Sequence, residues 1–122
     1  MEPKSVIHVV VTQCSPEVEE EYNAWMDDTH VPMLLEFKGL KGVAKYKLVS
    51  ETHPYVPGSL VDAPGGYSEH MLILEFASRQ DFEAYETSPE LAAALEESRT
   101  HDWRGLHEKS RRAQYEFVRS WR

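Results

Sequence analysis

The sequence predicts one α+β domain, residues 1–122, in which strands and helices follow the order β-α-β-β-α-β. Two observations lead to this prediction. Four short apolar segments have the alternating or β-branched composition of strands, and helical periodicity follows the first and the third of them. This is the order of the split βαβ, or ferredoxin-like, arrangement, a four-stranded antiparallel sheet with the helices on one face. A chain of 122 residues leaves room for a single domain.

The first predicted strand is residues 6–12, VIHVVVT, which are apolar on both alternating faces apart from His8. We expect such a strand to be buried on both sides of its sheet. Ser15 and Pro16 then supply the N-cap and the first position of a helix. A helix is therefore expected to begin directly after this strand.

The first helix is expected to bury an apolar stripe and to expose acidic residues on the opposite side. The stripe consists of Val18, Tyr22, Trp25, Met26, Thr29 and Met33. Pro32 lacks a backbone N–H and disfavours helical dihedral angles in the residue before it, so the helix should kink or stop near His30. Gly39 is expected to end the segment.

The remaining elements complete the predicted order. The strands are residues 42–50, 69–76 and 112–121. A helix capped by Ser78 runs to residue 86, and Ser88 and Pro89 restart it up to residue 98. Residues 101–108 are interpreted as a further short helix or turn.

Residues 52–68 form a long Pro/Gly-rich loop in this prediction, because they hold three of the seven prolines and three of the six glycines. Loops of this length in a small domain are often lids or binding elements. Tyr55 and Tyr67 flank its prolines and would close over a ligand if the loop is a lid.

A second copy of the chain is expected to cover the sheet face that the helices leave open. The first and third strands carry apolar residues on that face, and a large exposed apolar surface usually marks an interface. Homodimers are the commonest way to bury such a surface. The sequence therefore predicts a homodimer in which two sheets lie face to face.

The charge of the chain limits the classes of partner. Acidic residues outnumber basic ones, with a net charge of −8, whereas nucleic acids and anionic membranes need a basic face. The acidic residues can form an ordinary solvated surface or can favour an uncharged or cationic small ligand. No apolar stretch reaches membrane-spanning length, and the N-terminus lacks a cleavage site. We expect a cytoplasmic protein.

No pattern in the sequence indicates a metal or nucleotide cofactor. The six histidines lack paired spacing such as HExxH, and one cysteine, Cys14, cannot form a CxxC pair. There is no phosphate-binding glycine loop and no dinucleotide fingerprint. We therefore expect no cofactor and no metal.

Residues 22–40, YNAWMDDTHVPMLLEFKGL, resemble the W-x-x-x-x-H-x-P-x-L-L…G segment of EthD-like proteins, which belong to the dimeric α+β-barrel superfamily. Family members usually carry Pro-Gly before the second strand, where this chain has Lys38-Gly39. The resemblance implies a ligand pocket between the sheet and the helices of each subunit, with His30 at its mouth or wall. It selects no reaction, because the superfamily includes monooxygenases, decarboxylases, isomerases, polyketide cyclases and haem enzymes.

His30 is the leading catalytic candidate. On a regular helix it lies about 80° round from Tyr22, at the edge of the buried stripe, where it can reach both the core and a cleft. An imidazole with a pKa of about 6.5 can move a proton in either direction at neutral pH. The alternative is a histidine that only caps the end of the helix.

Two more histidines are candidates for catalysis. His8 interrupts an apolar strand, so it is either hydrogen-bonded in the core or directed into a pocket. Some members of the superfamily place a first-strand histidine in the active site, and the resemblance extends this role to His8. His70 begins the third strand beside the long loop, where it could meet an entering ligand.

Several other residues are candidates for ligand binding. The aromatic ones are Tyr22, Trp25, Tyr46, Tyr67 and Tyr115. Residues on a helical stripe usually serve the core, although Trp25 can form a pocket wall at the same time. The hydroxyls of Tyr46 and Tyr115 could bind a substrate carbonyl, or these rings could simply fill the pleated sheet. Arg104, Arg111 and Arg112 could bind a carboxylate, although isolated arginines are usually solvated.

Together these residues predict a cofactor-independent enzyme that performs acid/base chemistry on a small apolar carbonyl or aromatic compound. His30 would be the general acid/base, aided by His8 or His70, in an isomerase, cyclase, decarboxylase or other lyase. One alternative is a cofactor-free monooxygenase acting on a phenolic or polyketide-like substrate. Another is a non-catalytic ligand-binding accessory dimer.

Overall fold

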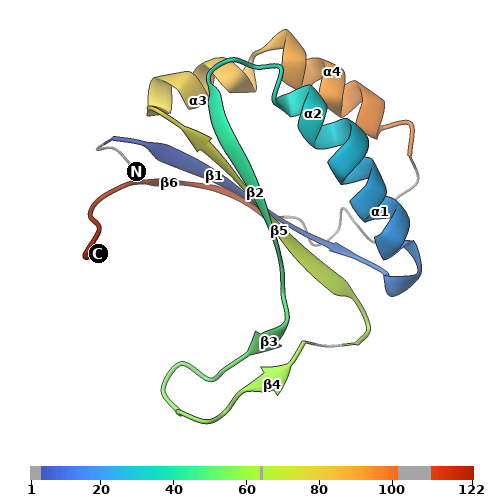
Figure 1. Ribbon diagram of the computed structural model, residues 1–122, viewed down its shortest axis with the longest axis vertical. Helices are drawn as coiled ribbons and strands as arrows, with labels where there is room; N and C mark the ends of the chain where they lie inside the picture. The colour runs from blue at the N-terminus through green and yellow to red at the C-terminus, as the bar shows by residue number, and fades with distance from the viewer. Residues whose placement is uncertain (1–3, 64, 102–110) are drawn as a thin grey trace.

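The computed structural model describes residues 4–63, 65–101 and 111–122, and contains a four-stranded antiparallel sheet with helices on one face (Figure 1). The strands are β1 (Val6–Cys14), β2 (Leu40–Lys47), β5 (Ser68–Phe76) and β6 (Arg111–Glu116), in the spatial order β2-β5-β1-β6. The helices are η1 (Pro16–Val18), α1 (Glu19–Trp25), the π-helical η2 (Met26–His30), α2 (Val31–Leu34), α3 (Arg79–Glu86) and α4 (Pro89–Ser98). The predicted α+β, ferredoxin-like fold is confirmed.

The last strand is shorter than predicted. β6 pairs with β1, and its final residue Glu116 lies opposite Val6, the first residue of β1. The Phe117 N–H still donates to the Ser5 carbonyl at 2.7 Å, but among the described residues no strand follows Glu116, so the strand predicted over 112–121 ends early. The short helix or turn predicted over 101–108 lies outside the described residues except for His101.

The second helical region agrees closely with the local signals in the sequence. The Ser78 hydroxyl accepts a hydrogen bond from the Asp81 N–H at the start of α3. The Ser88 hydroxyl accepts one from the Leu91 N–H at the start of α4, and it donates to the Tyr85 carbonyl at 2.7 Å. Ser88 therefore fixes the corner at which α3 ends and α4 begins.

The first helix is disturbed where the sequence predicts it, but it does not stop. In η2 the Val31 N–H donates to the Met26 carbonyl, five residues back instead of four. A regular turn would press the Pro32 ring against the carbonyl of Asp28, and the wider turn relieves this clash. The helix then resumes as α2 and ends at Leu34. Of the two outcomes expected near His30, a kink or a stop, the structure thus shows an irregular turn and not a stop.

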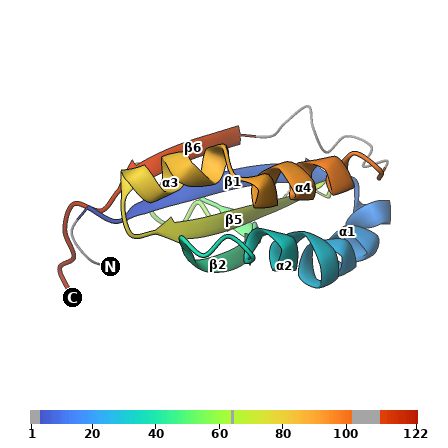
Figure 2. The same ribbon diagram turned by 90° about the horizontal axis from the view of Figure 1, so that it is seen from above.

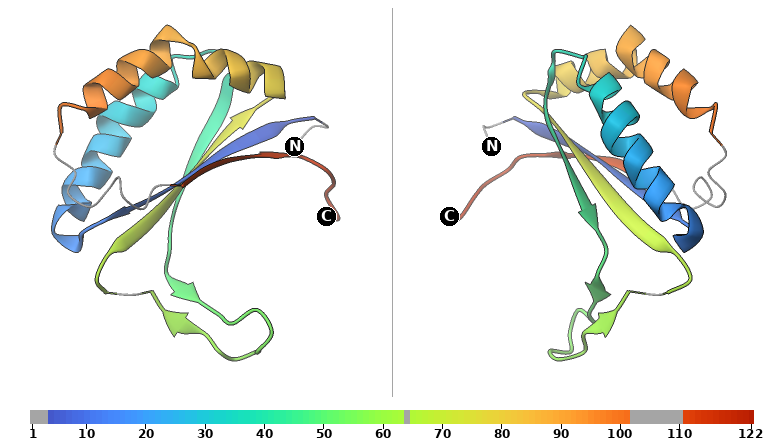
Figure 3. Two further views of the ribbon diagram at one scale, coloured as in Figure 1. Left: turned by 180° about the vertical axis from the view of Figure 1, so that it is seen from behind. Right: turned by 45° about the vertical axis from the view of Figure 1, so that its right-hand side comes forward.

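The two faces of the sheet differ in their surroundings (Figure 2). The helices lie over the face that carries His8, Leu72, Leu74 and Phe76, and the last two are almost completely buried, at 1% and 0% exposure. None of the described helices covers the opposite face (Figure 3). On that face, half-buried apolar residues pair across the central strands, for example Val9 with Ile73.

Most of the loop predicted over residues 52–68 forms an arm that projects from the sheet (Figure 1). Two short strands, β3 (Ser50–Glu51) and β4 (Val61–Asp62), pair antiparallel at its base. The arm extends beyond the ends of β2 and β5, away from the helical layer (Figures 1 and 3). Tyr55 near its tip is 87% exposed. A lid over the helical side of the sheet is thus not formed by this segment.

Candidate functional site

A cavity of about 390 Å³ lies between the helix-facing side of the sheet and the helical layer. Aliphatic residues of β1, β5, α2 and α4 form much of its wall, together with Trp25. Its polar residues include His8, His30, Tyr85, Arg112 and Gln114. A mainly apolar cavity with a few converging polar groups is the usual form of a small-molecule site.

His30 reaches this cavity because of the π-helical turn. On a regular helix, two residues five positions apart point about 140° away from each other. In η2 the extra residue in the turn brings His30 over Trp25, and the two rings stack with centroids 4.5 Å apart and planes at 24°. The sequence prediction assumed a regular helix and placed His30 only at the stripe edge. The signal that could have revealed the turn was Pro32.

The His30 ring is held as a neutral base. Its Nδ1 atom is buried and has no hydrogen-bond partner in the described part of the chain. Burial lowers the pKa of His30, the Glu97 carboxylate acts in the opposite direction, and the Arg112 charge lowers it further. At pH 7 the imidazole is therefore mostly uncharged, and one of its nitrogens offers a free lone pair.

His8 lies beneath the helices and combines the two roles left open by the sequence. It is buried and also lines the cavity. The Gln114 amide donates to its Nδ1 at 3.1 Å, so the proton of the neutral ring sits on Nε2. Burial, followed by the charge of Arg112, lowers the pKa of His8 to about 4. His8 is thus a hydrogen-bond donor that stays uncharged at neutral pH.

Tyr85 is a functional candidate that the sequence analysis missed. It belongs to α3, which the periodicity marks only as a covering helix. Tyr85 is buried, and burial raises the pKa of its hydroxyl far above the ordinary value. The phenol therefore remains protonated and can donate a hydrogen bond at any physiological pH. Gln114, which orients His8, was missed for a similar reason, since a polar residue on an edge strand carries no signal by itself.

Trp25 forms one wall of the cavity, and a hydrogen bond to Glu97 of α4 holds its indole in place. Its indole Nε1 donates to Glu97 Oε1 at 2.7 Å. The other oxygen of Glu97 lies 2.8 Å from His101 Nε2. These hydrogen bonds, from His101 first and then from Trp25, lower the pKa of Glu97. Trp25 is therefore both a core residue and a pocket wall, as the sequence allowed.

Tyr22 also lines the cavity, and its hydroxyl forms a 2.9 Å hydrogen bond with the Thr12 hydroxyl. Burial raises the pKa of Tyr22, so this phenol is protonated as well. Of the eight predicted site residues, the structure thus brings four together around one cavity. They are His8, His30, Tyr22 and Trp25.

The other four predicted residues lie elsewhere. Tyr46 pairs with Met71 and Tyr115 pairs with Ile7, which places both tyrosines on the open face of the sheet. Successive strand residues point to opposite faces, and the sequence alone does not say which set meets the helices. His70 is buried, but its Nε2 lies 2.9 Å from Glu19 Oε2, and it does not line the cavity.

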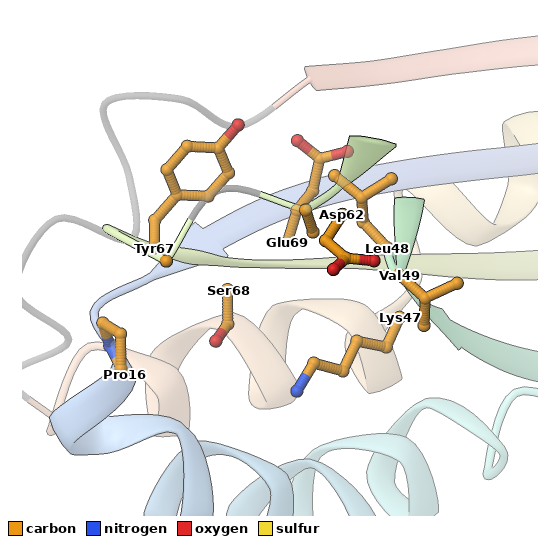
Figure 4. Close-up of a pocket in the computed structure, with 10 residues that line it drawn as sticks. Pro16, Lys47, Leu48, Val49, Asp62, Tyr67, Ser68 and Glu69 are labelled. Atoms are coloured by element: carbon orange, nitrogen blue, oxygen red, sulfur yellow. The ribbon is translucent and has the colours of Figure 1, made fainter. Parts of the chain in front are cut away.

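Tyr67 lines a separate hollow of about 370 Å³ at the base of the arm (Figure 4). Charged residues of both signs surround it, including Lys47, Asp62 and Glu69. The Lys47 ammonium is already 3.1 Å from Glu19. This hollow contains none of the three predicted catalytic histidines, so the helix-side cavity is the stronger candidate for chemistry.

The described residues contain neither a candidate metal site nor a candidate membrane-spanning helix. Within residues 4–63, 65–101 and 111–122, no group of three or more His, Cys, Asp or Glu side chains is placed to hold a metal ion. None of the helices in these ranges is long and apolar enough to cross a membrane.

Residues 5–105 match a protein family described as a domain of unknown function, DUF4286. The chain belongs to this family. The match covers β1 through α4 and therefore most of the residues that build the cavity of this DUF4286 protein. No curated protein matches the sequence.

Solved structures share the architecture of this DUF4286 protein at low sequence identity. An EthD family protein from Bacillus halodurans C-125 is 12% identical, with a TM-score of 0.61 over 93% of this chain and 99% of that one. A hydroxynitrile lyase from Passiflora edulis is 18% identical, with a TM-score of 0.63 over 99% and 100%. A dimeric protein of ferredoxin-like fold from Bacteroides fragilis is 19% identical, with a TM-score of 0.58 over 96% and 100%.

Two structures described as putative antibiotic biosynthesis monooxygenases share the fold as well. The EthD-like, dimeric α+β-barrel resemblance is therefore confirmed as a likeness of fold. Identities this low carry no information about which reaction the DUF4286 chain performs.

Proposed function

We propose that this DUF4286 protein is a cofactor-independent acid/base enzyme for a small, mainly apolar carbonyl or aromatic compound bound in the helix-side cavity. The observation that carries the proposal is the Nδ1 atom of His30, which is buried in the cavity wall without a hydrogen-bond partner among the described residues. Buried polar atoms are rarely left unpaired, because an unmade hydrogen bond costs about 1–3 kcal/mol. Because His30 lines the cavity, rotation of its ring about the Cβ–Cγ bond would turn this nitrogen toward a bound substrate, which would supply the missing partner.

His30, His8 and Tyr85 are all uncharged at pH 7, which suits one of them to accept a proton and the other two to donate hydrogen bonds. His30 would take a proton from a C–H or O–H group of the substrate, since its free lone pair is available at pH 7. The Nε2–H of His8 and the hydroxyl of Tyr85 would donate hydrogen bonds to the substrate oxygen and stabilise the negative charge that develops there. Return of the proton to another atom gives isomerisation, and departure of a leaving group gives a lyase reaction.

Stacking on Trp25 would keep the base in place. The indole is tied to α4 through Glu97, and the imidazole lies flat against it. A base that cannot rotate away loses little orientational freedom when substrate binds. The hydroxynitrile lyase among the structural neighbours supports a lyase as the coarse class, which we place first.

A cofactor-free monooxygenase is the second candidate, and the monooxygenases of the same fold support it. It would use the same base to form a substrate carbanion, which would give its electrons to O2 and combine with it as a hydroperoxide. Loss of water from the hydroperoxide would leave one oxygen atom in the product. A ligand-binding protein without turnover is the third. All three share the cavity, so a binding measurement alone does not separate them.

The test is a screen of α-hydroxynitriles, small ketones and phenols with the purified protein in D2O. Substrate loss and deuterium incorporation are followed by NMR, and oxygen uptake is followed with an electrode. We expect conversion or deuterium exchange without oxygen uptake. Oxygen uptake that matches substrate loss would favour the monooxygenase. Binding to the cavity with no conversion of any compound would leave the accessory role.

We also infer that the protein is a homodimer in which the open faces of two sheets meet. On that face Tyr46 and Tyr115 are 54% and 48% exposed, and apolar residues of β1 and β5 lie between them. The dimeric relative of ferredoxin-like fold supports this arrangement.

Ile73→Asp is expected to separate the two subunits, because it places a carboxylate in the centre of the contact without disturbing the helical side. Light scattering coupled to gel filtration should give twice the 14.1 kDa chain mass for the wild type and a single chain mass for the variant. Ala92→Asp, on the exposed side of α4, is the matched control and should remain dimeric. A monomeric wild type at micromolar concentration would exclude the dimer.

A further inference from the structure

Two neighbouring arginines of strand β6 lie on opposite faces of the sheet, Arg112 on the side of the cavity and Arg111 on the open face. Arg112 pairs with Val10, and Gln114 pairs with His8, so both residues lie on the helix-facing side of the sheet. Arg112 is a lining residue of the cavity. Arg111 pairs with Val11 and lies on the opposite face, where it donates to the Tyr115 hydroxyl at 3.1 Å.

Arg112 has no counter-charge in the described part of the chain. Other arginines there have partners, as Arg79 with Glu83 and Arg99 with Glu96 show. No carboxylate of the described residues forms a salt bridge or hydrogen bond with Arg112. Glu86 also lines the cavity, and both it and Arg112 are exposed residues, but no ion pair joins the two.

The charge of Arg112 affects the protonation of three groups that line the cavity, His8, His30 and Tyr85. Arg112 lines the same cavity as these three residues. Burial has the largest effect on the pKa of each of these groups, and the Arg112 charge adds to the lowering at both histidines and opposes the rise at Tyr85. Because these three groups are neutral at pH 7, Arg112 is the cation that an entering ligand meets along the described lining. The net charge of −8 matters less here, since distant surface charges are screened within about 8–10 Å.

We propose that Arg112 is the anion-binding group of the cavity and that the ligand is a small aromatic or branched carboxylic acid. The carboxylate would pair with the guanidinium, while the apolar part of the ligand would lie against Trp25 and Leu72. A carbonyl or hydroxyl group on the same ligand would then face His8 and Tyr85. The inference uses the cavity of the proposed function and names its substrate class, but it does not depend on turnover.

The test compares sodium benzoate with benzamide, a neutral molecule of almost the same shape. Their binding to the full chain is measured by calorimetry, and the imidazole signals of His8 and His30 are followed by NMR. We expect benzoate to bind more tightly than benzamide to the wild type. Arg112→Gln should weaken benzoate binding about tenfold or more, as expected for a charge-assisted pair, and should leave benzamide binding unchanged.

Arg111→Gln is the matched control, because it removes the same charge one residue away on the other face of the sheet. It should leave both affinities unchanged, with gel filtration and a thermal melt showing that both variants keep the wild-type assembly and fold. Equal losses of benzoate affinity in the two variants, or no binding of benzoate, would overturn the inference.

The two proposals fail in different ways. If benzamide binds and shifts the His30 signal while benzoate does not bind, the anion site is wrong and the cavity of the proposed function stands. If benzoate binds through Arg112 but neither the compounds of the substrate screen nor their carboxylate-bearing analogues are converted or exchange deuterium, the anion site stands and the catalytic proposal is wrong.

Discussion

Replacing His30 with alanine is expected to lower kcat/KM by about 10²–10⁴-fold, the usual contribution of one positioned acid or base. The fold should survive the change. Nδ1 has no hydrogen-bond partner among the described residues, so its removal leaves none of their groups unpaired. The main structural loss is the stacking on Trp25, worth about 0.5–1.5 kcal/mol. Activity should therefore fall far more than the free energy of unfolding.

The measurement is the rate of conversion of whichever compound the screen identifies, with unfolding by urea as the second readout. His53→Ala is the matched control, since His53 is exposed on the arm and remote from the helical layer. In the wild type, kcat/KM should fall as the pH drops through the lowered pKa of His30, because protonation removes the lone pair. Full activity of His30→Ala would remove His30 from the mechanism.

His8 is expected to make the folded protein lose stability in acid. Its pKa is about 4 in the folded protein and about 6.5 in the unfolded chain. Between these values the unfolded state binds more protons, so the free energy of unfolding rises with pH and falls as the pH is lowered. A difference of this size corresponds to about 3 kcal/mol, fully present above pH 6.5 and lost by about pH 4.

Urea unfolding at several pH values between 7.5 and 4 measures this loss, at one protein concentration because association adds its own stability. His8→Gln removes the titrating group and keeps a side chain that can pair with Gln114. Its stability should depend less steeply on pH over this range. His53→Gln removes an exposed histidine and should follow the wild-type curve. Identical pH dependence in all three proteins would show that His8 titrates normally.

Much of the fold could be predicted from short stretches of sequence, such as helix-capping residues and runs of β-branched residues. The serines before α3 and α4 act as caps, and the β-branched run of β1 lies in the centre of the sheet. The sequence did not show which side chains of each strand lie on the helix-covered face, because an alternating pattern does not say which face the helices cover. For that reason the sequence left open whether Tyr46 and Tyr115 meet a ligand or fill the pleated sheet.

The candidate site was predictable only in part, because its decisive contacts join distant residues. His70 meets Glu19 across 51 positions, and Gln114 meets His8 across 106. No local pattern marks such pairs. His30 was chosen from its motif, yet its direction depends on a turn that departs from the regular helical period, so the expected angle from Tyr22 did not apply.

The π-helical turn also has a consequence for how such proteins diverge. A helix with this turn holds one residue more than a regular helix between the same two ends. Trp25 before the turn and Leu34 after it are both buried, so the core fixes the two ends and leaves the extra residue to the segment between them. Gain or loss of a single residue there would swing the imidazole into or out of the cavity without moving a strand. If His30 is the base that we propose, a change of one residue in this segment, with a matching change at Pro32, would be enough to add or remove activity on this scaffold.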